Sequence, residues 1–112
     1  GRLSPPSPRL ASLLRSLAKA HGSPSFQDLA DFDVTLEATH HGPFVDTPAL
    51  FAEVGSTEEE WGRDDVGRCW AEALWSEFSA QPEEARGPVL LVIGGNHYMT
   101  QVSDLVVEGP PL

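Results

Sequence analysis

Histidines at two places in this 112-residue sequence are the residues best suited to do chemistry. His40 and His41 stand side by side in ATHHGP, and His97 follows two glycines in GGNHY. An imidazole binds metal ions and also exchanges a proton near neutral pH. Two glycines before His97 would let the backbone approach a ligand closely. These residue types point to a metal-binding or proton-transferring site.

The spacing leaves several interpretations open. Adjacent side chains on an extended backbone point to opposite sides, so His40 and His41 can face one ion only if the chain turns at residues 42–43, Gly-Pro. Glu37 and Glu53 lie near the ends of expected strands and could act as metal ligands or bases. The alternative for each glutamate is an ordinary solvent-facing position.

Other reactive or aromatic residues are better explained by structure. The acidic run 58–60 fits the first turn of a helix, where the helix dipole favours negative charge. Trp61, Trp70 and Trp75 are expected to pack, and Cys69 falls on an apolar stripe that makes it a core residue. The common metalloprotease, nucleotide-binding and serine-hydrolase signatures are absent from the sequence.

The charge balance argues against a basic nucleic-acid surface. Seventeen acidic residues face seven basic ones, giving a net charge of −10, whereas phosphate-binding surfaces are normally basic. No apolar run is long enough to span a membrane, and no leader peptide is visible, so we expect a cytoplasmic protein, with an organelle as the alternative. Four of the seven bases precede residue 20: Arg2, Arg9, Arg15 and Lys19.

Two helices are predicted. Apolar residues recur at helical spacing after Pro8, with Ser7 as a cap and Gly22 as the stop. A second, long helix is predicted from about residue 57 to about residue 80, because STEEEW contains a capping box. Its predicted buried stripe comprises Val66, Cys69, Trp70, Ala73, Leu74 and Phe78.

Strands are predicted at residues 33–38, 49–55 and 88–93, with 104–109 as a further candidate. The order strand, long helix, strand over residues 49–93 predicts a parallel β-α-β crossover and hence an α/β fold. Residues 1–7 are expected to form an extended or disordered lead-in, and residues 8–112 a single domain.

The strand ends are where a ligand would bind in such a fold. These ends carry Gly55 and the GGNHY segment. The link from Ala38 to Ala49 is short for a parallel crossover. If the first two strands are antiparallel, the histidine pair starts at the opposite end of the sheet from His97, and the sequence leaves open whether they converge.

Three blocks together resemble a known family. EATHHGP, PALFAEVGSTEEEW and IGGNHY occur in an order and spacing similar to those of the archaeal and plant type of D-aminoacyl-tRNA deacylase, as does the helix SPRLASLLRSLAKA. The resemblance implies hydrolysis of the ester between a D-amino acid and tRNA, a role for zinc, and a mixed, partly parallel sheet flanked by helices, like nucleoside phosphorylases and peptidyl-tRNA hydrolases. Members of the family are more than twice as long, so we expect this chain to be part of a longer protein.

The resemblance also assigns provisional roles within the blocks. An activated water would attack the ester carbonyl, with the histidines as ligands, base or transition-state stabiliser. The alternatives are a zinc-dependent hydrolase of small esters or amides without RNA, and a chain that is catalytically inert. The expected catalytic residues are His40, His41, His97 and Glu37; the expected substrate-binding residues are Thr39, Gly94, Gly95, Asn96 and Tyr98; and the expected metal ligands are His40, His41, His97 and Glu53.

Overall fold

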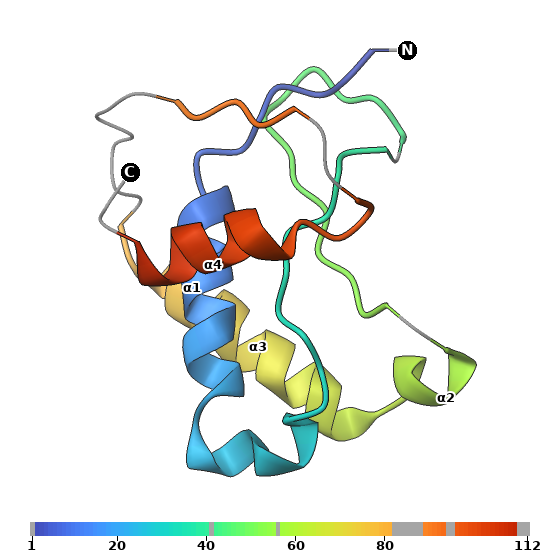
Figure 1. Ribbon diagram of the computed structural model, residues 1–112, viewed down its shortest axis with the longest axis vertical. Coiled ribbons are helices and arrows are strands. Elements are labelled where there is room, and N and C mark those ends of the chain that lie inside the picture. Colours follow the sequence, from blue (N-terminus) through green and yellow to red (C-terminus); the bar gives the residue numbers. More distant parts are fainter. Residues whose placement is uncertain (1, 41, 56, 82–88, 94–95, 110–112) are drawn as a thin grey trace.

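A computed structural model of the chain describes residues 2–40, 42–55, 57–81, 89–93 and 96–109. Helices and long extended segments make up this part of the chain (Figure 1). Helix α1 packs against α3 and α4, and a short 3₁₀ helix, η1, joins the contact between α1 and α3. The elements are α1 (Leu10–His21), η1 (Pro24–Leu29), α2 (Glu58–Trp61), α3 (Asp64–Ser79) and α4 (Thr100–Glu108).

Helix α1 forms where the apolar spacing predicts it. Leu13, Leu14 and Ala20 are buried on one side, and Leu17, three or four residues from each of them, is partly buried, as expected for one face of a helix. The Ser7 hydroxyl accepts a hydrogen bond from the Arg9 amide at 3.2 Å. At the other end, the Gly22 amide donates to the carbonyl of Ala18, which closes the last turn.

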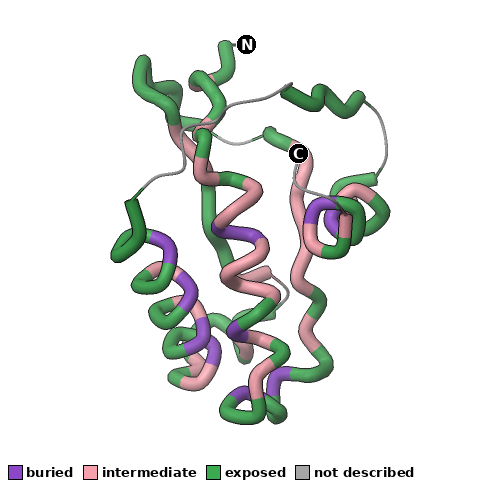
Figure 2. The backbone as a smooth tube through the Cα atoms, turned by 90° about the vertical axis from the view of Figure 1, so that its left-hand side faces the viewer, coloured by how far each residue is buried: buried purple, intermediate pink, exposed green. Residues whose placement is uncertain are grey.

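The apolar core lies where α1, η1 and α3 meet. Figure 2 shows buried positions, in purple, along the inner sides of the helices. Because few elements surround this core, it is small for a chain of this length. Its buried members are Ala20, Phe26, Leu29, Val66, Cys69 and Ala73, with Leu17, Phe32, Val54 and Trp70 packed around them.

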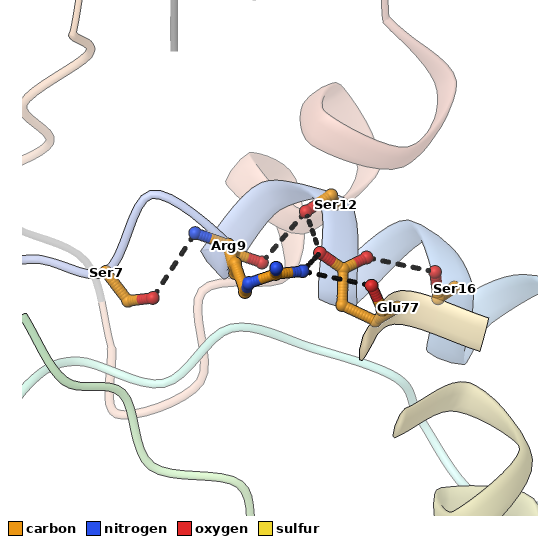
Figure 3. Close-up of polar contacts among 5 residues, drawn as sticks. All are labelled: Ser7, Arg9, Ser12, Ser16 and Glu77. Carbon is orange, nitrogen blue, oxygen red and sulfur yellow. Dashed lines mark hydrogen bonds and ion pairs between the residues drawn. The ribbon is translucent and has the colours of Figure 1, made fainter. Parts of the chain in front are cut away.

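A polar cluster also joins α1 to α3 (Figure 3). Glu77, only 8% exposed, accepts a hydrogen bond at its Oε1 atom from Arg9 Nη1 at 3.1 Å and from the Ser12 hydroxyl at 2.7 Å. Arg9 Nη1 also donates to the Glu77 backbone carbonyl at 2.9 Å, and the Ser16 hydroxyl lies 3.5 Å from Oε2. Charge and hydrogen bonds together offset the cost of burying the carboxylate.

The predicted long helix is two helices in the structure. The break falls at residues 62–63, where Arg63 is extended and its guanidinium pairs with Glu60 at 2.9 Å and with Asp65 at 2.8 Å. The predicted stripe is confirmed at Val66, Cys69 and Ala73 and only partly at Trp70 and Leu74. Phe78 is exposed, and Glu77 is buried instead, where its carboxylate accepts hydrogen bonds from Arg9 and Ser12. Trp61 and Trp75, which were expected to pack, are exposed.

The predicted sheet is absent from the described residues, so the expected α/β fold with its parallel crossover is wrong for this structure. Residues 33–38, 49–55 and 89–93 are extended, but a strand needs a neighbour to bond its backbone groups. Within the described ranges, two isolated bridges form: Pro6 with Ala49, and Glu37 with Tyr98. The candidate strand at 104–109 is largely helical, as part of α4. The apolar run of this segment is too short to distinguish the periodicity of a helix from that of a strand.

Candidate active site

Two extended segments from distant parts of the chain bring the candidate residues together. The Ala38 amide donates to the His97 carbonyl at 3.0 Å, and the Met99 amide donates to the Leu36 carbonyl at 2.9 Å. The resulting antiparallel bridge pairs Glu37 with Tyr98. His40 and His97 are therefore brought together by local pairing of two extended segments.

Three side chains form a compact cluster at this bridge. Glu37 Oε1 lies 2.6 Å from His97 Nε2 and 3.4 Å from His40 Nε2. The two imidazole rings lie 4.6 Å apart between centroids. One ligand atom from each of Glu37, His40 and His97 falls within 4.8 Å of the others. This spacing allows all three to contact one small cation.

The orientation of His40 is fixed by its own backbone. Its Nδ1 lies 2.6 Å from the Ala38 carbonyl, and a carbonyl can only accept, so Nδ1 carries the proton. Nε2, the other ring nitrogen, faces the Glu37 carboxylate at 3.4 Å and is therefore the atom of His40 that could contact a metal ion.

Solvent reaches the cluster from one side. The Glu37 side chain is 19% exposed, whereas those of His40 and His97 are 44% and 52% exposed. The Tyr98 ring packs edge-on against His97, with centroids 4.7 Å apart. A half-buried carboxylate between two open imidazoles leaves room for a substrate.

The remaining predicted residues divide into three groups. Thr39 is exposed beside the cluster, and Asn96 and Tyr98 line a neighbouring hollow. Glu53 lies on an exposed segment and is not one of the three clustered ligands. Predicted residues outside the described part of the chain are His41, Gly94 and Gly95.

Sequence reasoning placed Glu53 among the metal ligands, whereas Glu37 has the ligating geometry. Glu37 was a candidate ligand or base, like Glu53, because it lies near the end of an expected strand, but its pairing with His97 depends on the bridge register, which no local pattern reveals. Gly55 was noticed only as a strand end, although it borders Tyr98. Burial raises the pKa of the Cys69 thiol, which keeps it protonated and agrees with its expected place in the core.

The sequence of the chain matches one known family of proteins. A sequence model of the family described as D-aminoacyl-tRNA deacylase matches residues 1–110. Proteins with the same description from Arabidopsis thaliana and Methanothrix thermoacetophila are 37% and 36% identical, over 86% and 96% of this chain. One from Cenarchaeum symbiosum is 40% identical over 70% of it.

The match covers only part of each relative. The chain spans 32%, 38% and 30% of the Arabidopsis, Methanothrix and Cenarchaeum proteins, about a third of their length. No solved structure matches it. Among the helices of the described residues, none has the length and apolar character needed to cross a membrane.

Proposed function

Because the chain belongs to the D-aminoacyl-tRNA deacylase family, we propose that it serves the hydrolysis of the ester that joins a D-amino acid to tRNA, and that Glu37, His40 and His97 are its reactive centre. The convergence of these three side chains carries the proposal. They come from two of the sequence blocks that resemble the family, and Glu37 Oε1 lies 2.6 Å from His97 Nε2 and 3.4 Å from His40 Nε2.

The donor set fits zinc. Two imidazoles and one carboxylate are a ligand set found at catalytic zinc sites that keep a position open, and the two histidines here are half-exposed. The Nδ1 contact of His40 with its backbone is the type of support that orients a ligating imidazole. Zinc, when bound, supplies a Lewis acid that polarises the ester carbonyl.

The chain's own residues would bind, orient and accept protons. Glu37 would either complete the ligand set or, if the two histidines hold the ion without it, accept the proton, since its carboxylate faces the Nε2 atoms of both histidines. Ester hydrolysis requires a group that takes a proton from water and returns one to the leaving ribose hydroxyl. Tyr98, which is 49% exposed, would donate a hydrogen bond to the substrate.

A second candidate is a hydrolase of small esters or amides that uses no RNA. The net charge of −10 favours it, because phosphate groups would be repelled. The two candidates share the same cluster and differ only in substrate, so one set of substrates separates them.

The test combines metal binding with hydrolysis. Zinc affinity of the chain is measured by competition with a chromophoric chelator, for the wild type and for His40→Ala, His97→Ala and Glu37→Gln. We expect each variant to lose about tenfold or more in affinity. His21→Ala is the matched control, because His21 bonds to the Leu29 carbonyl, away from the cluster. Unchanged affinity in the three cluster variants would overturn the zinc site.

Hydrolysis is then followed with D-tyrosyl-tRNA, L-tyrosyl-tRNA and a small p-nitrophenyl ester. Faster release from the D-form than from the L-form, lost in His97→Ala while circular dichroism is unchanged, supports the proposed function. Turnover of the small ester alone would favour the second candidate. Absence of turnover with all three substrates, in a chain that binds zinc, would favour a catalytically inert chain.

A further inference from the structure

A hollow of about 310 Å³ lies directly beside the cluster. One wall is the extended segment 92–93 and another is the start of α4. Ligand pockets that take small organic groups start at about this volume. Four of the lining residues are apolar, namely Val92, Ile93, Met99 and Val102, and the polar ones include Asn96 and Tyr98.

Tyr98 connects the hollow to the reactive centre. Its side chain lines the hollow, and its ring packs edge-on against His97 at 4.7 Å. His97 in turn places Nε2 2.6 Å from Glu37 Oε1. If the cluster held the carbonyl of a substrate, the group attached to that carbonyl could therefore reach the hollow.

The two regions differ in chemistry. The cluster consists of a carboxylate and imidazoles, whereas half of the residues that line the hollow have aliphatic or thioether side chains and the other half are uncharged polar residues or tyrosine. An aminoacyl ester has the same division, with a polar carbonyl and ribose on one side and a side chain on the other. The wall carries no acidic or basic residue, so it offers no partner to a charged side chain.

We propose that this hollow receives the side chain of the aminoacyl group, and that it favours apolar and aromatic side chains over alanine. The inference rests on the proposed function for the identity of the substrate. Each additional buried methylene strengthens binding by about fourfold. A phenylalanyl group should therefore bind at least about tenfold more tightly than an alanyl group.

Met99 provides a direct probe, because it is the only methionine of the chain and it lines the hollow. Protein labelled with ¹³C in the methionine methyl group gives one resonance for this position. The probes are D-phenylalanyl and D-alanyl adenosine in which an amide replaces the ester, so that neither is hydrolysed. We expect the D-phenylalanyl compound to shift the Met99 signal saturably, at about tenfold lower concentration than the D-alanyl compound.

Substitutions then fill the hollow. Val102→Trp should weaken the D-phenylalanyl compound by about tenfold and leave the D-alanyl compound unchanged. Gln101→Trp is a second plug at an exposed wall position, in case Val102→Trp disturbs packing. Leu105→Trp, exposed on the same helix and not part of the wall, is the matched control.

The outcomes distinguish this inference from the proposed function. Equal affinity for the two compounds, or affinity unaffected by both plugs, overturns the hollow as a side-chain site even if the chain hydrolyses D-aminoacyl-tRNA. Discrimination that both plugs abolish supports the hollow even if no hydrolysis is detected, and in that case only the proposed function fails.

Discussion

The hydroxyl of Tyr98 occupies the space that a side chain on Gly55 would need. A β-carbon at Gly55 would lie 3.1 Å from Tyr98 Oη, closer than ordinary van der Waals contact. The backbone of Gly55 is not in the left-handed region, so its lack of a side chain matters for space and not for conformation. The contact seats the Tyr98 ring against His97, and so it connects the segment before α2 to the cluster.

Gly55→Ala should therefore displace Tyr98 and loosen His97. We expect zinc affinity to fall by about threefold to tenfold, because neighbouring contacts orient a ligating imidazole. Gly62→Ala is the matched control, since a β-carbon there meets nothing within 4 Å. The double variant Gly55→Ala/Tyr98→Phe removes the clashing oxygen and should recover most of the loss. Equal affinities for the Gly55 and Gly62 variants would contradict the positioning role.

Glu77→Ala should destabilise the contact between α1 and α3. The substitution leaves the Arg9 guanidinium and the Ser12 hydroxyl without their half-buried acceptor. We expect a loss of about 2–3 kcal/mol in the free energy of unfolding, measured by urea denaturation. Glu72→Ala, at an exposed position of the same helix, should change it by less than about 0.5 kcal/mol. A Glu77 variant as stable as the wild type would show that the cluster is energetically neutral.

Gly67→Ala should stabilise the protein. Gly67 lies inside α3, and a β-carbon there meets no atom within 4 Å. Alanine restricts the unfolded chain and favours the helix by about 0.5–1 kcal/mol relative to glycine. The urea midpoint should rise with an unchanged denaturant slope. A lower midpoint would mean that the space around Gly67 is filled in solution.

The pairing of Arg63 with Asp65 should contribute to stability in a pH-dependent way. Hydrogen bonds from the Arg63 guanidinium hold the pKa of Asp65 below its ordinary value of 3.8. A carboxyl group whose pKa is lowered by folding stabilises the protein above its unfolded pKa, and the contribution disappears as pH falls through the lower, folded value. The stability difference between the wild type and Asp65→Asn should thus be present at pH 7 and vanish at strongly acidic pH. A difference that grows on acidification would contradict this sign.

How much the sequence reveals depends on whether an element is stabilised locally. Helix α1 could be predicted because its apolar spacing and its end at Gly22 are local signals. The extended segments could not be assigned correctly, because a strand depends on a partner, and the apolar run 89–93 is exposed without one among the described residues. The sequence does not indicate the break at Arg63, because a capping pattern marks where a helix starts and not its length; α2 does start after Thr57, but the expected capping-box hydrogen bond is not formed there.

The same distinction holds at the site. Residue type, position near expected strand ends and the resemblance of the surrounding blocks to the family identified His40, His97 and Glu37 as candidates. Their geometry follows from an antiparallel bridge between residues far apart in sequence, and a register shift of one residue would turn Glu37 away. The choice of Glu53 as a ligand came from an expected sheet edge that is absent from the described residues.

The chain by itself should hydrolyse D-aminoacyl-tRNA slowly. Its net charge of −10 opposes the tRNA phosphates. Of the six basic side chains in the described residues, three are already engaged, because Arg9 and Arg63 pair with internal carboxylates and Arg15 donates to the Val106 carbonyl. The cluster is also open to water, which weakens the electrostatic stabilisation of a transition state. We expect a kcat/KM more than about tenfold below that of the Arabidopsis relative at equal salt, a barrier difference above about 1.4 kcal/mol. A kcat/KM less than about tenfold below that of the relative would show that the charge of this chain and the openness of its cluster do not limit its activity.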